Sequence, residues 1–78
     1  MKVSILIIRI FSETMNPIKA IIIDDEEGSR LTLKNLLKEY CSEIEILALA
    51  DSAATGRKAI QKYRPELVFL DVRMPAAD

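Results

Sequence analysis

The chain has 78 residues, half of them apolar, and its 11 basic and 12 acidic side chains leave a net charge of −1. This length allows at most one small domain, the apolar content excludes a disordered tail, and the charge balance gives no electrostatic basis for binding nucleic acid. The single cysteine, Cys41, excludes an internal disulfide, and the absence of histidine excludes a His-based triad and the usual zinc sites.

Residues 1–15 are expected to form an N-terminal extension ahead of the domain. Within it, Val3 to Phe11 is an apolar stretch interrupted by Arg9. This stretch is too short to span a bilayer, and no small-residue cleavage site follows it. We therefore expect Met15 to be the natural initiator and the domain to be cytoplasmic, without membrane contact. A weak signal or anchor segment is the alternative.

The first strand of the domain is expected over the β-branched run Ile18 to Ile23, which ends at Asp24 and Asp25. Its lack of strict alternation suits a strand covered on both faces. From Glu27 to Tyr40 the apolar period becomes that of a helix. The apolar stripe of this helix, which we interpret as ordinary core packing, consists of Leu33, Leu36, Leu37 and Tyr40. We interpret Cys41, just after the helix, as a small half-buried residue rather than a reactive thiol.

A second strand is expected over Ile44 to Leu49, followed by a turn in which Ser52 or Asp51 caps the next helix. The apolar spacing places that helix from Ala53 to Tyr63. Gly56 lies on its apolar face, where glycine costs about 1 kcal/mol against alanine. This residue therefore indicates a close approach of the helix to the sheet.

The second helix is expected to end before Pro65, because proline disfavours the helical conformation of the preceding residue. A third strand then covers Glu66 to Leu70, with Asp71 at its carboxyl end. The order β-α-β-α-β with short connections predicts an α/β fold with a parallel sheet. Because ligands of such sheets lie at the carboxyl ends of the strands, Asp24, Asp25 and Asp71 are expected to meet there.

Two strands that end in aspartate within one sheet indicate a site, although each acidic cluster alone is commonly a solvated turn. Like charges about 4 Å apart repel by about 4 kcal/mol at an effective dielectric of about 20, so the group must bind a cation or keep a proton. Oxygen ligands of this kind suit Mg²⁺, which would hold the phosphate of an incoming donor. Asp71 has no acidic neighbour and is the candidate nucleophile, whereas the adjacent Asp24 and Asp25 suit the ion.

Two segments, IIIDDE from Ile21 to Glu26 and PELVFLDVRMP from Pro65 to Pro75, together resemble the receiver domain of bacterial two-component response regulators. The resemblance implies a partial doubly wound, flavodoxin-like sheet with the three expected strands in the order 2-1-3. It implies a phosphoacceptor domain rather than an enzyme, in which Asp71 receives a phosphoryl group from a sensor histidine kinase. The Mg²⁺ ligands that it implies are Asp24, Asp25, Asp71 and the main-chain carbonyl of Arg73.

By the family pattern, residues 16–78 are the N-terminal portion of a receiver, truncated before its switch elements. The segment from Ala50 to Val72 is similar to receivers that precede a LytTR-type DNA-binding domain. We therefore expect such an output domain in full-length relatives, and no direct nucleic-acid binding by this chain. The alternative is a non-switching interaction module, which would bind a kinase through Leu31 to Tyr40, or an inert remnant. A metal-dependent phosphohydrolase is disfavoured, because Arg73 stands where such enzymes tend to carry a second acid.

The expected third strand lies at the edge of this shortened sheet. An apolar edge over Leu67 to Leu70 is an aggregation hazard. The extension offers a remedy, because Val3 to Phe11 could pair with that edge.

Overall fold

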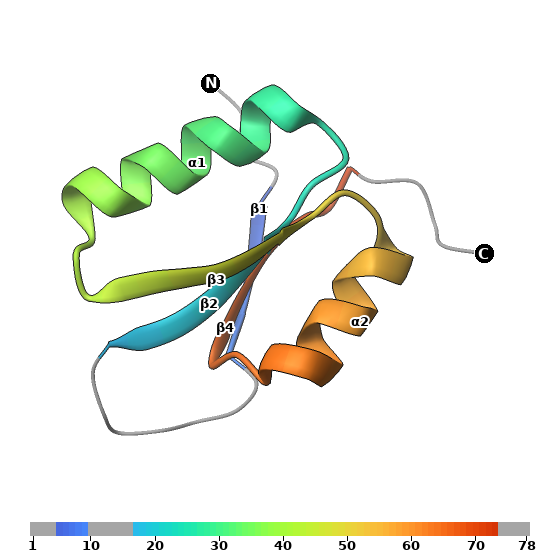
Figure 1. Ribbon diagram of the computed structural model, residues 1–78. Helices are drawn as coiled ribbons and strands as arrows, with labels where there is room; N and C mark the ends of the chain where they lie inside the picture. Colours follow the sequence, from blue (N-terminus) through green and yellow to red (C-terminus); the bar gives the residue numbers. More distant parts are fainter. Residues whose placement is uncertain (1–4, 10–16, 74–78) are drawn as a thin grey trace.

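One mixed sheet with a helix on each face makes up residues 5–9 and 17–73, which the computed structural model describes (Figure 1). The elements in chain order are β1 (Ile5–Arg9), β2 (Ile18–Ile23), α1 (Glu27–Tyr40), β3 (Ile44–Ala50), α2 (Ala53–Tyr63) and β4 (Leu67–Asp71). Both helices and β2 have the predicted bounds. β3 extends one residue further than predicted, and β4 begins and ends one residue later than predicted.

The strands of the described residues follow the order β1-β4-β2-β3 across the sheet. β2 pairs in parallel with β3 on one side and with β4 on the other. This arrangement confirms the predicted α/β fold and the order 2-1-3 of the three expected strands. β2 is therefore the inner strand between β3 and β4.

The side chains of β2 alternate between two apolar cores, because successive residues of a strand point to opposite faces. α1 lies on one face of the sheet and α2 on the other (Figure 1). The buried residues of the core under α1 are Ala20, Ile22, Leu37 and Phe69. The buried residues of the core under α2 are Ile21, Ile23, Ala50 and Val68. β2 thus supplies apolar side chains to both cores, as its run of β-branched residues predicted.

Ser52 caps the N-terminus of α2. Its Oγ accepts a hydrogen bond from the main-chain N–H of Thr55 at 3.1 Å, and the Thr55 Oγ1 accepts one from the Ser52 N–H at 3.0 Å. This reciprocal capping box satisfies main-chain donors at both positions. The prediction that Ser52 or Asp51 caps the helix is therefore confirmed for Ser52. At the other end, Arg64 adopts a left-handed conformation with φ of 48° directly before Pro65.

Gly56 is buried where α2 crosses β2. A Cβ atom added at this position would lie 2.5 Å from Cδ1 of Ile23. The glycine is therefore required by the contact between helix and sheet, as its place on the apolar face of α2 predicted.

The apolar stripe of α1 only partly reaches the core. Leu37 is buried and Leu33 is half-buried, but Leu36 is 47% exposed and Tyr40 is 74% exposed. The prediction of core packing is therefore wrong for Leu36 and Tyr40. Among the described elements the backbone of α1 approaches β2 and β3, and the flank on which these two side chains lie is open to solvent. Neither α1 nor α2 has the length and apolarity needed to cross a membrane.

β1 occupies the outer edge of β4. It pairs antiparallel with β4, from Ile5 opposite Asp71 to Arg9 opposite Leu67. The predicted pairing of the extension with this edge is therefore confirmed for β1. Other positions of the predicted segment, such as Val3 and Phe11, lie outside the described residues. The sheet consequently has one strand more than the β-α-β-α-β pattern alone predicted.

Candidate metal centre

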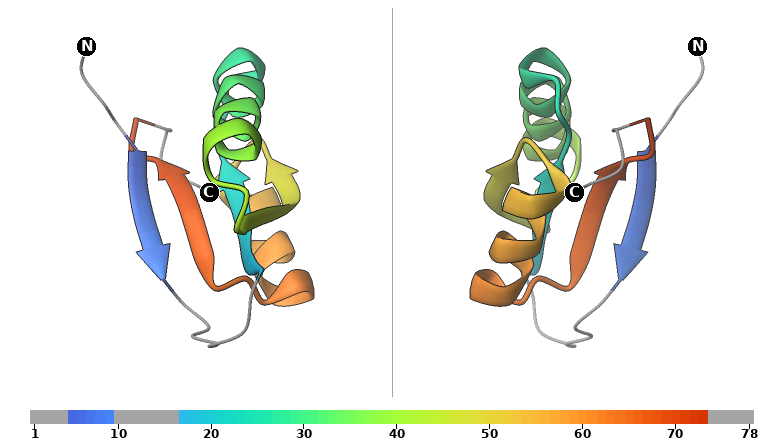
Figure 2. Two further views of the ribbon diagram at one scale, coloured as in Figure 1. Left: turned by 90° about the vertical axis from the view of Figure 1, so that its left-hand side faces the viewer. Right: turned by 90° about the vertical axis from the view of Figure 1, so that its right-hand side faces the viewer.

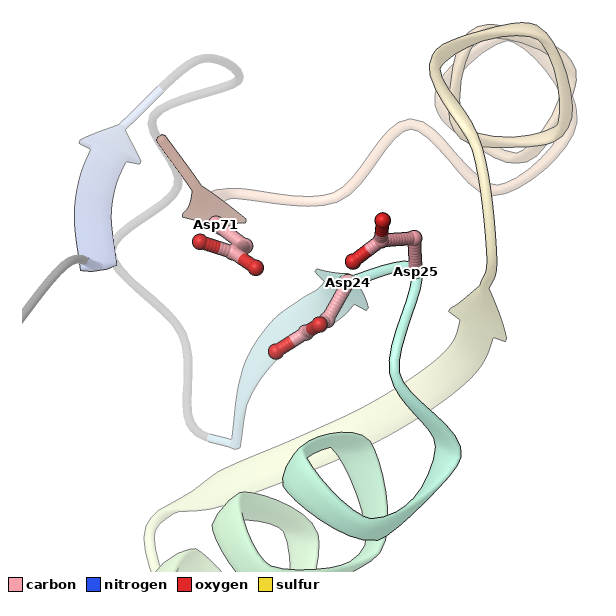
Figure 3. Close-up of side chains that lie close together, drawn as sticks. All are labelled: Asp24, Asp25 and Asp71. Carbon is pink, nitrogen blue, oxygen red and sulfur yellow. The ribbon is translucent and has the colours of Figure 1, made fainter. Parts of the chain in front are cut away.

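Three aspartate side chains converge at the carboxyl edge of the sheet (Figure 3). Asp24 and Asp25 directly follow β2, and Asp71 is the last residue of β4. β2 and β4 are parallel neighbours, so their carboxyl ends meet at the same edge. One carboxylate oxygen from each aspartate lies within 4.8 Å of the other two. The structure thus brings together the three side chains that the sequence singled out, whereas their chemical roles stay predictions.

The three carboxylates differ in their access to solvent. Asp24 and Asp71 are 2% and 3% exposed, whereas Asp25 is exposed. Burial removes water from a carboxylate and disfavours its charged form. Asp25 is therefore the member of the cluster that keeps its hydration.

Asp24 is the aspartate of the cluster whose ionised form is disfavoured. Burial raises the pKa of its carboxyl above the ordinary value of 3.8, and the negative charge of Asp71 adds to this effect. The main-chain N–H of Glu26, which donates to Asp24 Oδ1 at 2.9 Å, opposes the rise in pKa only in part. Asp24 is thus the first of the two buried aspartates to take up a proton as the pH falls.

Asp71 is held in its ionised form by Arg73. The main-chain N–H of Arg73 donates to Asp71 Oδ1 at 2.9 Å, and its Nε donates to the same oxygen at 3.2 Å. These hydrogen bonds, led by the main-chain one, lower the pKa of Asp71 below 3.8 despite its burial. Both contacts use Oδ1, and Figure 3 shows one oxygen of Asp71 pointing toward Asp24 and Asp25.

Arg30 is a site residue that the sequence reasoning missed. Its Nη1 donates to the main-chain carbonyl of Asp24 at 2.8 Å, so the first turn of α1 fixes the loop that carries Asp24 and Asp25. The signal available in the sequence was a basic residue one turn into the helix that follows the acidic loop. Within the described residues, the carboxylate cluster does not include the neighbouring Glu26 or Glu27.

The donor set fits a hard divalent cation. It consists of carboxylate oxygens, two of which are buried beside each other and repel when both are ionised. Mg²⁺ binds through one or two carboxylates and keeps several waters, and the exposed Asp25 leaves the cluster open to solvent on that side. The side chain of Arg73 is 63% exposed, so it can leave Asp71 when a cation enters. The role of the main-chain carbonyl of Arg73 as a further ligand stays a prediction.

The comparisons with known proteins agree with this geometry. The model of the family described as "Response regulator receiver domain" matches residues 20–78. The chain is 41% identical over 59 residues to an uncharacterized response regulatory protein of Vibrio cholerae, covering 76% of this chain and 23% of that protein. It is 43% identical over 58 residues to the transcriptional regulatory protein BtsR of Escherichia coli, covering 74% of this chain and 24% of that protein.

A third relative is named for an enzymatic activity. The chain is 39% identical over 61 residues to a protein-glutamate methylesterase/protein-glutamine glutaminase of Sulfurimonas denitrificans, covering 78% of this chain and 17% of that protein. The chain thus spans at most about a quarter of the length of these three relatives. No solved structure matches the chain. The family match and the shared acidic edge lead to one conclusion: the chain belongs to the response regulator receiver domain family.

Proposed function

We propose that this chain acts in phosphorelay signalling as a receiver module, with Asp71 as the residue that accepts a phosphoryl group from a sensor histidine kinase. One observation carries the proposal: a buried carboxylate with a lowered pKa ends β4 within 4.8 Å of two further carboxylates. A nucleophile must be ionised to attack, and Asp71 is the buried aspartate that stays ionised.

Mg²⁺ is the proposed cofactor, held by Asp24, Asp25, Asp71 and the main-chain carbonyl of Arg73. The oxygen-only donor set supports this choice, as does the pKa of Asp24, which is raised by burial and by the negative charge of Asp71. When bound, the ion would supply positive charge for phosphate oxygens. Arg30 would keep the ligand loop in place through the Asp24 carbonyl.

The proposed step is an in-line displacement at phosphorus. A carboxylate oxygen of Asp71 forms the new P–O bond, while the P–N bond of the donor phosphohistidine breaks. The leaving imidazole nitrogen takes the electron pair of that bond, and because the other ring nitrogen carries a proton, the histidine leaves as neutral imidazole. The main-chain N–H of Arg73 donates to Oδ1 of Asp71 at 2.9 Å, which orients the attacking carboxylate. In this proposal the chain accepts the phosphoryl group and does not catalyse repeated conversion of a substrate, so it is a phosphoacceptor rather than an enzyme.

The setting of the module is also part of the proposal. We assign residues 1–15 to an extension and residues 16–78 to the N-terminal portion of a receiver, in a cytoplasmic protein. The relatives are longer, and one is named a transcriptional regulatory protein, so an output domain that binds DNA is proposed for full-length relatives rather than for these residues. The near-neutral charge of the chain gives no basis for direct nucleic-acid contact.

The direct test is phosphorylation by a small-molecule donor. The chain is incubated with acetyl phosphate and Mg²⁺, and its intact mass is followed over time. We expect an adduct of one phosphoryl group that requires Mg²⁺ and is absent from Asp71→Asn. Asp51→Asn is the matched control, because Asp51 is an exposed aspartate after β3 and lies outside the cluster. The proposal fails if the wild type gains no mass, or if Asp71→Asn gains as much as the wild type.

A second candidate function is docking of a partner without phosphoryl transfer. α1 exposes three large apolar side chains, Leu31, Leu36 and Tyr40, at 43%, 47% and 74% of their surface. Such side chains suit a helical partner surface, including that of a kinase. Capture of a kinase that survives Asp71→Ala but is lost in Leu36→Glu would favour this function.

A further inference from the structure

β1 is attached to the rest of the sheet through β4 alone. Among the described elements, β1 pairs with no other strand, and Ile5 and Ile8 pack at the margins of the cores under α1 and α2. Figure 2 shows β1 (blue) and β4 (red-orange) standing to one side, away from α1 and α2. The attachment therefore consists of the antiparallel ladder and the packing of two half-buried side chains, Ile5 and Ile8.

The two middle apolar side chains of β1 add little to that ladder. Leu6 is 45% exposed and Ile7 is 58% exposed, although these two residues point to opposite faces of the sheet. Cross-strand pairs contribute roughly 0.2–1 kcal/mol each, so the ladder and the half-buried Ile5 and Ile8 hold β1 less firmly than a strand that is buried on both faces. The buried residues of both cores lie in other elements, so β1 can leave β4 while those residues stay packed.

The place that β1 would leave is specific for an extended apolar segment. The outer edge of β4 offers main-chain hydrogen-bonding groups. Leu67 and Phe69 belong to the core under α1, and Val68 and Leu70 belong to the core under α2, so β4 is apolar on both faces. Open edges of this kind pair with another strand. The segment that fits this edge is known from the structure itself, because residues 5–9 are seated on it.

We propose that the outer edge of β4 is a strand-binding site that also takes β1 of a second copy, which gives a strand-exchanged dimer. Exchange of an identical element between protomers is a low-cost route to dimers, because each chain regains the contacts that it gave up. A net charge of −1 gives little repulsion between copies. In this dimer Ile5 of the partner subunit lies opposite Asp71, so each copy contributes a residue beside the acidic cluster of the other.

The exchange depends on protein concentration. A short connection gives the chain's own β1 an effective concentration on the order of millimolar at its edge. The fraction of exchanged dimer therefore rises as the protein concentration approaches that value. At lower concentrations the dimer is detected by trapping it covalently. The exchange involves no phosphoryl chemistry, so it stands or falls apart from the proposed function.

The test uses full-length chains in which Cys41→Ala removes the natural thiol. One chain carries Leu6→Cys, and a second chain, labelled with ¹⁵N, carries Leu70→Cys, the residue opposite position 6 in the ladder. The two are mixed, oxidised mildly and weighed as intact species. A second matched mixture uses Ile7→Cys with Phe69→Cys, because adjacent antiparallel pairs alternate in separation and a disulfide needs the right one.

The control mixture combines Leu6→Cys with Phe69→Cys, whose side chains point to opposite faces. We expect covalent heterodimer in a matched mixture, several-fold above this control and rising with protein concentration. A doubly substituted Leu6→Cys/Leu70→Cys chain reports the same pairing within one molecule. The proposal is overturned if the doubly substituted chain closes its internal disulfide while the matched mixtures yield no more heterodimer than the control. It is equally overturned if no disulfide forms in any chain.

Circular dichroism shows whether each cysteine variant unfolds cooperatively and is therefore folded. A second measurement, which needs no substitution, tests the exchange if the variants do not fold. Unsubstituted chains, half of them labelled with ¹⁵N, are concentrated and examined by native mass spectrometry. We expect mixed dimers that an excess of a synthetic peptide of residues 1–11 dissociates, because the peptide competes for the edge of β4. Dimers that the peptide leaves intact, or the absence of mixed dimers at every concentration, would contradict the exchange.

Discussion

Gly56→Ala tests the closest contact between helix and sheet. The new Cβ would lie 2.5, 3.0 and 3.1 Å from Cδ1, Cγ1 and Cγ2 of Ile23. Ile23 is 4% exposed and lies in the middle of the sheet between β3 and β4, so it has no room to retreat. Overpacking costs about 1–3 kcal/mol, whereas alanine in place of a helical glycine gains about 1 kcal/mol. With three atoms obstructed, we expect a net loss of about 1–2 kcal/mol in the free energy of unfolding.

Gly28→Ala is the matched control, since Gly28 is the other glycine of the chain and also lies in a helix. A Cβ at this position meets only Glu26 Oε1, at 3.9 Å, which is an ordinary contact. We expect a gain of up to about 1 kcal/mol, because only the helix propensity changes. Urea denaturation followed by circular dichroism measures both variants against the wild type.

Ile23→Val in the Gly56→Ala chain locates the clash. Valine lacks Cδ1, the atom that lies 2.5 Å from the added Cβ. The two substitutions should therefore be less destabilising together than the sum of the single changes, by about 1 kcal/mol or more. The packing argument is refuted if Gly56→Ala stabilises the protein as Gly28→Ala does, or if the two changes simply add.

Four further outcomes follow from the acidic edge. In metal-free protein, Asp24→Asn should raise stability at neutral pH and weaken Mg²⁺ binding in calorimetric titrations, because it removes a buried charge beside Asp71. Burial raises the pKa of Asp24, so the wild type should lose stability as the pH rises from 3.8 through that raised pKa, and urea titrations of Asp24→Asn should lack this loss. Arg73→Met should raise the pKa of Asp71, seen by NMR of its carboxyl carbon, and change stability little because Arg73 is mostly exposed. Mg²⁺ should slow hydrogen exchange in β1, because Ile5 pairs opposite Asp71, and equal slowing in Asp71→Asn would contradict this coupling.

The sequence predicted the elements whose signals are local. The period of apolar residues and the flanking turns defined α1 and α2 to the residue, and Gly56 indicated the close crossing that the structure contains. The convergence of Asp24, Asp25 and Asp71 was predictable because parallel topology alone brings the ends of neighbouring strands together.

Features that depend on long-range packing were not predictable in the same way. The period of α1 defines a face but not what covers it, and the exposure of Leu36 and Tyr40 follows from the limited reach of the helix over the sheet. The contact from Arg30 to the Asp24 carbonyl depends on a side-chain direction that spacing does not specify. The ion pair of Arg73 with Asp71 likewise needs the geometry of the turn after β4.

The position of β1 bears on how the protein can be produced. A recombinant chain that starts at Met15 would keep both helices and the acidic edge but would expose the apolar margin of Leu67–Asp71. Such a shortened product should be prone to inclusion bodies during expression, whereas the longer one carries its own solubilising segment. The choice of start codon therefore decides the yield of folded material before any question of signalling arises.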